Sequence, residues 1–204
     1  MKKITLSIVA VLAFGFANAQ EVKFGVKGGI NLSTLTGDME DASSKVGFQV
    51  GGFAEIKLSD KFSVQPELLY STQGAKEKSN VFDADAMELV SADFTTKLAY
   101  INVPVMAKYY VAEKFSLEAG PQIGFLVSAK GKMSGGGDSQ EEDIKDFYKS
   151  IDFGVNFGAG YDFTENLSAG VRYNLGLSNI LENEAGDNFK NKNSVFSLSV
   201  GYKF

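Results

Sequence analysis

The chain has 204 residues, a formal net charge of −5, 22 glycines and 3 prolines, and it contains no cysteine and no histidine. The length suggests one domain, and the acidic balance argues against nucleic-acid binding, because contact with phosphates needs a cationic surface. Without cysteine and histidine, most zinc sites and the Ser-His and Cys-His pairs of hydrolases are excluded.

The first predicted element is a short apolar segment. Two lysines near the start precede an apolar run over 4–16, which is followed by an A-x-A site formed by Ala17 and Ala19. This arrangement is typical of a secretory signal peptide, and the run is shorter than the about 20 apolar residues that a spanning helix needs. We therefore predict a signal peptide over 1–19, cleaved after Ala19, and a single mature domain over 20–204.

Apolar and polar residues alternate strictly in much of the remaining chain. In the clearest case, Phe196, Leu198 and Val200 alternate with Ser197 and Ser199. A period of two is typical of β-strands, whereas a helix would distribute these residues all round its surface. In chain order, the pattern predicts eight strands, at about 22–32, 45–58, 62–73, 96–111, 115–129, 150–163, 167–177 and 194–204.

Two kinds of connection join the predicted strands. Three connections are tight turns that carry an acidic residue, Asp60, Glu113 or Glu165, at a nearly constant spacing. Short turns at one end of a sheet and long loops at the other are typical of outer-membrane barrels. The remaining connections are predicted to be long polar loops, at about 33–44, 74–95, 130–149 and 178–193.

The two faces of the strands distinguish a membrane barrel from a soluble, lipocalin-like barrel with its apolar face inward. The polar face is rich in glycine, serine, asparagine and glutamine, which suit a crowded interior, whereas a soluble barrel would show lysine and glutamate there. The apolar face carries many aromatic rings, which favour the headgroup region of a bilayer. Because backbone N–H and C=O groups cannot stay unpaired in hydrocarbon, we predict an all-β fold, a closed up-and-down antiparallel transmembrane β-barrel of eight strands.

Three segments carry a family resemblance: the strand over 24–32, the segment over 100–105, and the C-terminal residues Val200, Tyr202 and Phe204. With them the chain resembles the small OmpA-like and OmpX-like outer-membrane barrels of the porin-like superfamily of Gram-negative bacteria. The resemblance implies that Phe204, with Tyr202 and Val200 at alternate positions before it, is the signal read by the barrel-assembly machinery. It also implies a location in the outer membrane, with outer-membrane lipids as partners.

Charged residues on the polar face form the main candidate site. Five of them are expected at similar heights near the end with the tight turns. One interpretation is a gate or selectivity constriction for ions, and the other is a salt-bridge plug that satisfies buried charges. We favour the plug, because about eight strands leave an interior just filled by side chains. The five residues are Glu55, Glu67, Lys108, Glu118 and Arg172.

The predicted loops offer little further chemistry. Loop 130–149 is acidic but lacks the ordered spacing of a calcium-binding loop, so we predict no metal site and no cofactor. Asp83 and Asp85 could act as acid and base, but nothing places them in a pocket, and no catalytic residue is predicted. The sequence thus predicts a monomeric, non-enzymatic protein with a structural or surface-interaction role, whose external loops contact an extracellular ligand or surface partner. A narrow pore for ions or small solutes is the alternative.

Overall fold

The computed structural model describes residues 21–38, 42–83, 88–135, 138–182 and 189–204. In this part of the chain, no helix is long and apolar enough to cross a membrane. The predicted signal peptide, with Ala17 and Ala19, lies outside the described residues, so its removal stays a prediction. The elements are β1 (Val22–Gly37), β2 (Ser43–Lys57), β3 (Phe62–Asp83), β4 (Glu88–Ala112), β5 (Phe115–Gly135), β6 (Asp138–Asp143), the 3-10 turn η1 (Lys145–Phe147), β7 (Ile151–Asp162), β8 (Leu167–Gly176) and β9 (Asn191–Lys203).

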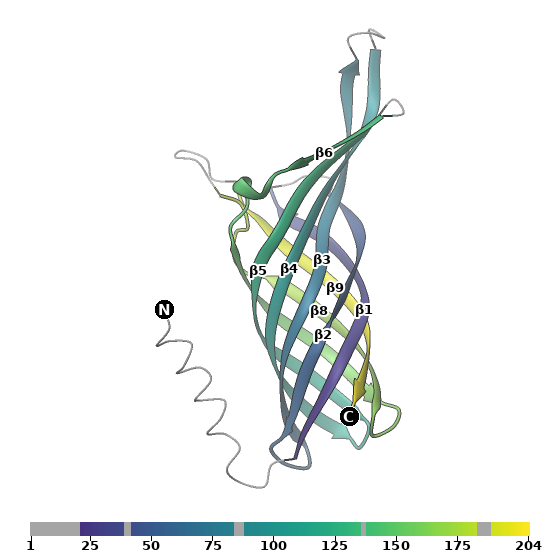
Figure 1. The fold of residues 1–204 in the computed structure, drawn as a ribbon, viewed down its shortest axis with the longest axis vertical. Helices are drawn as coiled ribbons and strands as arrows, with labels where there is room; N and C mark the ends of the chain where they lie inside the picture. The colour runs from purple at the N-terminus through teal and green to yellow at the C-terminus, as the bar shows by residue number, and fades with distance from the viewer. Residues whose placement is uncertain (1–20, 39–41, 84–87, 136–137, 183–188) are drawn as a thin grey trace.

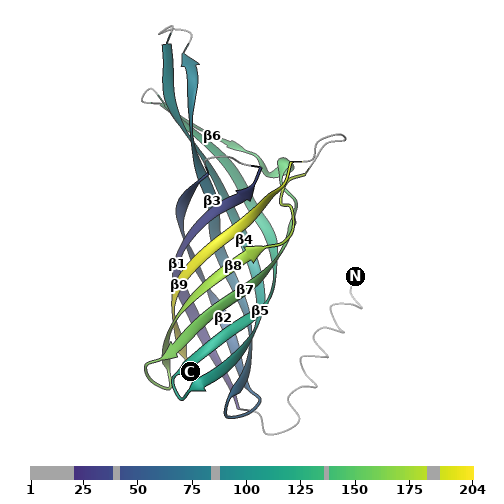
Figure 2. The same cartoon turned by 180° about the vertical axis from the view of Figure 1, so that it is seen from behind.

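Eight of the described strands form a closed antiparallel ring (Figure 1 and Figure 2). The order in the ring is β1-β2-β3-β4-β5-β7-β8-β9, and β9 returns to pair with β1. β6 stands outside the ring and pairs with the far end of β5. The predicted closed up-and-down barrel of eight strands is therefore confirmed.

The two ends of the barrel differ in their connections. The tight turns over 58–61, 113–114 and 163–166 gather at the end where β1 begins and β9 finishes (Figure 1). We call this the turn end. At the opposite end, the hairpin end, β3 and β4 continue as a long hairpin that projects well beyond the other strands (Figure 2).

The prediction of long loops is mostly wrong, because much of the length of these segments is β-strand. Loop 74–95 is the outer part of the β3–β4 hairpin, paired from Gly74↔Lys97 to Asp83↔Glu88. Most of loop 130–149 belongs to the β5–β6 hairpin and to η1, and β1 and β2 extend into loop 33–44. Outside the barrel both faces of a strand meet water, so the apolar alternation that marks a strand is lost there.

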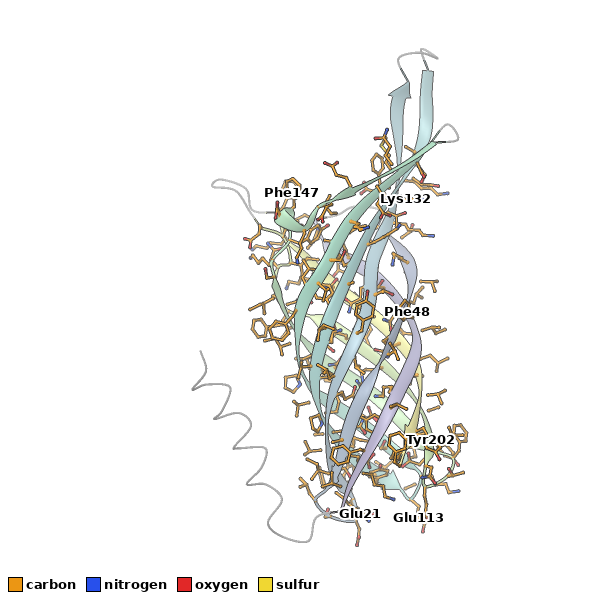
Figure 3. The ribbon with its side chains drawn as sticks, in the orientation of Figure 1. Glu21, Phe48, Glu113, Lys132, Phe147 and Tyr202 are labelled. Atoms are coloured by element: carbon orange, nitrogen blue, oxygen red, sulfur yellow. The ribbon has the colours of Figure 1, made fainter. Side chains whose placement is uncertain are left out.

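The faces of the strands point as the alternation predicts. On β9, Leu198 is 47% exposed and Val200 54%, whereas Ser197 is 6% exposed and Ser199 7%. The same holds round the ring, where outward apolar side chains such as Phe48 and Tyr202 lie on the surface (Figure 3). A lipocalin-like barrel would have the opposite orientation, so that alternative is wrong.

Glycine lets neighbouring strands approach closely on the inner face. A Cβ atom added at Gly51 would lie 2.0 Å from the carbonyl oxygen of Leu68, and one at Gly120 would lie 2.0 Å from that of Val105. At the outward-facing Gly52, by contrast, the nearest atom would be 3.6 Å away. The inward glycines therefore hold the strands at a spacing that a larger residue would not allow.

Candidate functional site

The structure brings the five predicted interior charges into one connected cluster. The Arg172 guanidinium on β8 donates two hydrogen bonds to the Glu67 carboxylate on β3, at 2.8 and 2.9 Å, and one to Glu118 on β5, at 2.9 Å. Lys108 on β4 donates to Glu55 on β2 at 3.1 Å, and its ammonium lies 3.8 Å from Glu118. Strands far apart in the sequence thus meet through these charges at one level of the barrel.

Further residues that we did not assign to the cluster extend it toward the turn end. Lys27 on β1 donates to Glu67 at 2.8 Å. Lys203 on β9 donates to Glu55 at 3.3 Å and to Asp162 on β7 at 3.1 Å. The period-two pattern places Lys27 and Lys203 on the inner face, but only the stagger between strands shows which carboxylates they reach. We call the following eight residues the interior ion-pair network: Lys27, Glu55, Glu67, Lys108, Glu118, Asp162, Arg172 and Lys203.

The interior ion-pair network is balanced and buried. It holds four cations and four carboxylates, and their side chains are between 0% and 17% exposed. Neutral groups complete the contacts: Tyr110 donates to Glu55 at 2.7 Å, and Gln65 donates to Glu67 at 2.6 Å. Because an unpaired buried charge costs several kcal/mol, this pairing allows a barrel to carry charges inside. The void beside the network has about 20 Å³, which is room for about one water molecule.

A second filled level lies at the hairpin end and is apolar. Two of its residues come from the chain between strands: Tyr148, which follows η1, and Ile180, which is fully buried. The backbone N–H of Lys149 donates to the carbonyl oxygen of Ile180 at 2.8 Å, and Tyr148 forms an isolated bridge with Leu181. We call this cluster the apolar plug, and its buried residues are Leu35, Ala75, Leu98, Tyr100, Leu126, Ala129, Tyr148 and Ile180.

The sequence did not reveal the apolar plug. We expected the inner face to be polar throughout and segment 178–193 to be a solvated loop, whereas Leu98 and Tyr100 are both inward-facing and nearly inaccessible. At the border of the plug, the Asp152 carboxylate accepts hydrogen bonds from Ser178 at 2.6 Å and from Asn193 at 2.8 Å. Polar side chains at its border and apolar side chains at its centre therefore together fill the barrel interior at the hairpin end.

The turn end opens into a wide polar cavity of about 770 Å³. Its inner wall is formed by Glu55, Tyr110, Asp162 and Lys203, which also contact one another as described above. We call this cavity the turn-end vestibule.

The remaining predicted residues take no part in these clusters. Val200, Tyr202 and Phe204 are exposed on the outer face near the turn end, and their role as an assembly signal stays a prediction. Asp85 and the side chain of Asp83 lie outside the described residues. In the part of the chain that the structure describes, no group of three or more Asp, Glu, His or Cys residues could hold a metal ion.

A closed ring of eight strands, apolar outside and filled with paired polar groups inside, defines a small transmembrane β-barrel. The model of the outer membrane protein beta-barrel domain family matches residues 16–182, which is more than half of the chain. The chain belongs to this family, and the resemblance inferred from its sequence is confirmed. A comparison with curated proteins found no match.

Solved structures share the fold at low sequence identity. Neisserial surface protein A is 18% identical, with a TM-score of 0.53, 90% of this chain covered and 99% of that chain. A major outer membrane protein from Thermus thermophilus is 14% identical, with a TM-score of 0.52 and coverages of 90% and 100%. Ail, the attachment invasion locus protein of Yersinia pestis, is 16% identical, with a TM-score of 0.50 and coverages of 90% and 99%. These similarities show the fold alone.

The location follows from the family and the fold. The protein resides in the outer membrane, where its apolar outer face meets lipid. In such barrels the short turns face the periplasm and the longer connections face the cell exterior. The turn end is therefore the periplasmic end, and the hairpin end is the cell-surface end.

Proposed function

We propose that the protein is a non-enzymatic barrel, closed to solutes, that acts by presenting an ordered surface for contact with a partner outside the cell. The observation that carries this proposal is that the interior is filled at two levels. The interior ion-pair network fills the lower level and the apolar plug fills the upper level. An eight-stranded barrel is just wide enough to be filled by side chains, so each level supports a closed barrel.

The lower level supports a plug more than a gate. Arg172 is held by three hydrogen bonds to two carboxylates that come from different strands. A gate would have to break such charge-assisted bonds, each about twice as strong as a neutral hydrogen bond. The four cations and four carboxylates of the network are all paired with one another. No charge in the network is therefore left unpaired to bind a passing ion.

The cell-surface end supports an interactive role. β6 and the outer parts of β3, β4 and β5 over 76–83, 88–97 and 130–135 continue beyond the ring. We call these four segments the surface sheet. Paired strands are already ordered, so binding of a partner there costs less conformational entropy than ordering a flexible loop would. The ring closes without the surface sheet. This supports a separate role for the surface sheet.

One observation favours a narrow pore as the second candidate function. The turn-end vestibule is open, and it reaches Glu55 and Lys203 of the interior ion-pair network. Planar-bilayer conductance separates the two candidates. We expect no steady single-channel currents from the wild-type protein. Steady currents that change in Glu118→Ala, but not in the rim variant Glu165→Ala, would establish the pore and refute the closed barrel.

The surface role needs the surface sheet to face the exterior. The chain has no cysteine, so single cysteines can be introduced at the exposed positions Lys78 and Glu113, the latter at the turn end (Figure 3). A maleimide that cannot cross membranes should label Lys78→Cys on intact cells, and Glu113→Cys only after the outer membrane is permeabilised. The reverse pattern would refute the proposed function.

A further inference from the structure

Lysines gather on the outward face of the surface sheet. Lys97 on β4 pairs directly with Lys130 on β5, and Thr95, two residues further, pairs with Lys132. Residues paired across a ladder, and residues two apart along a strand, share a face, so these lysines share one face. On β3, Lys76 pairs with the same Thr95 and joins them. The lysine patch comprises Lys76, Lys78, Lys97, Lys130 and Lys132.

The lysine patch lies next to the apolar band, by which we mean the exposed apolar side chains of the outer face that meet lipid. Along the outward row of β3, Leu68 and Tyr70 are followed by Thr72, Gly74 and then Lys76. Along β5, the exposed Phe125 and Val127 are followed, after a bulge, by Lys130. No acidic residue interrupts either described row between the apolar band and the first lysine. The ammonium groups therefore begin at the level where the headgroups of the outer leaflet lie.

The positive charges of the lysine patch are only partly neutralised. Glu141 on β6 accepts hydrogen bonds from Lys97 and Lys130. Lys76, Lys78 and Lys132 form no ion pair within 4.0 Å in the described part of the chain, although Asp93 is paired with Lys78 and Glu141 with Lys132 across the ladder. In addition, Lys97 and Lys130 are like charges directly opposite each other in the ladder. The fold thus holds like charges together, and a bound anion would relieve their repulsion.

The patch holds more lysines than the neighbouring part of the barrel. On β1 the outward row above the exposed Leu32 continues with Thr34 and Thr36, and among the described pairings the one lysine that joins this row is Lys192 on β9, opposite Thr36. The five lysines of the patch therefore gather over β3, β4 and β5. In Figure 3, Lys132 lies on the surface sheet and points away from the barrel axis.

We propose that the lysine patch binds the phosphate groups of anionic lipid headgroups in the outer leaflet around the barrel. The ligand is a lipid rather than a soluble anion, because the patch continues the apolar band, so a lipid can place its chains on the band and its phosphates on the lysines at once. Flexible lysine side chains suit phosphates at variable positions. This binding is separate from contact with an extracellular partner, and it can fail while the proposed function stands.

The test uses the purified full chain in phosphatidylcholine nanodiscs and measures binding of lipid A, a glycolipid with two phosphates, by native mass spectrometry. The variant K76Q/K78Q/K132Q removes the lysines of the patch that form no ion pair in the described part of the chain. The control K57Q/K61Q/K114Q removes three exposed lysines at the turn end. We expect the first variant to bind lipid A at least about tenfold more weakly, since each lysine near a charged membrane surface contributes measurably, and the control to bind like the wild type.

Four results would overturn the proposal. The first is unchanged binding in K76Q/K78Q/K132Q when its band on a heat-modifiability gel shows a folded barrel. The second is an equal loss in the control, which would indicate net charge alone. The third is equal binding of lipid A without its phosphates, which would indicate the apolar band alone. The fourth is inorganic polyphosphate binding as tightly as lipid A, which would indicate a soluble ligand.

Discussion

Replacing Glu67 by glutamine tests whether the interior ion-pair network stabilises the barrel. The Glu67 side chain is 0% exposed, and its carboxylate accepts two hydrogen bonds from Arg172 and one from Lys27. Glutamine keeps the shape but removes the negative charge, so two buried cations lose their shared partner. Breaking a buried pair in this way costs about 3–5 kcal/mol, and we expect the free energy of unfolding to fall by that amount.

Two matched variants provide a comparison for the loss of unfolding free energy expected in Glu67→Gln. Glu118 makes one short contact with Arg172, at 2.9 Å, and one long contact with Lys108, at 3.8 Å, so Glu118→Gln should cost about 1.5–3 kcal/mol, the range for one hydrogen bond to a charged group. Glu21 pairs with Lys23 at 3.2 Å but is 57% exposed, and Glu21→Gln should cost less than about 1 kcal/mol, as surface pairs do. The expected order of loss is therefore Glu67, then Glu118, then Glu21.

The assay is urea unfolding of the barrel refolded in detergent micelles. Because the chain has no tryptophan, the folded fraction is best followed by the gel shift that distinguishes folded from unfolded barrels, and by circular dichroism. The slope of the transition should stay constant, so the midpoint reports stability. A loss below about 1 kcal/mol in Glu67→Gln, or a similar loss in Glu21→Gln, would refute the reasoning.

Three further predictions concern the strands and the surface sheet. Gly51→Ala should lower the free energy of unfolding by about 1–3 kcal/mol, because its Cβ would lie 2.0 Å from a backbone oxygen, while Gly52→Ala, with 3.6 Å of space, should not; equal urea midpoints would contradict this. Hydrogen bonds from Lys130 and Lys97 lower the pKa of Glu141 from its ordinary 4.5 to about 2, so the stability that its charge contributes is present above pH 4.5 and is lost as the pH falls toward 2. A carbon-13 NMR titration should find the midpoint near 2, and an unshifted midpoint in the wild type would disprove the pairing. Spin labels at Leu198 and Val200 should report lipid and those at Ser197 and Ser199 should not, and labels that all behave alike would argue against the assigned faces.

The transmembrane part of the fold could be predicted from the sequence because lipid imposes a simple rule there. Each spanning strand has one face in hydrocarbon and one in a crowded interior, so residues such as Leu198 and Ser199 alternate along it. The rule fails beyond the hydrocarbon, where neither face of a strand meets lipid chains, so that Lys76 and Glu77 can follow one another. The outer parts of β3, β4 and β5 were therefore taken for loops.

The interior site could be predicted in part. Counting residues from the tight turns gives each strand's height, which was enough to place Arg172 near Glu67 and Glu118. Counting does not show how far β9 is shifted along β1 where the two strands close the ring. Lys203 and its contact with Glu55 were therefore missed. The apolar plug was missed for another reason: Ile180 reaches the interior from a connection, and the alternation along strands says nothing about such segments.

Lys203 on β9 has a consequence for how the barrel is assembled. Lys203 pairs with Asp162 on β7 and gives Glu55 on β2 a second cation besides Lys108, so the charges of the interior ion-pair network balance only when β9 docks beside β1. Before that step, three cations face four carboxylates, and the outer edges of β1 and β8 have no neighbour. Insertion should therefore be all-or-none, and chains clipped before Lys203 should be degraded in the periplasm rather than persist as partly formed barrels.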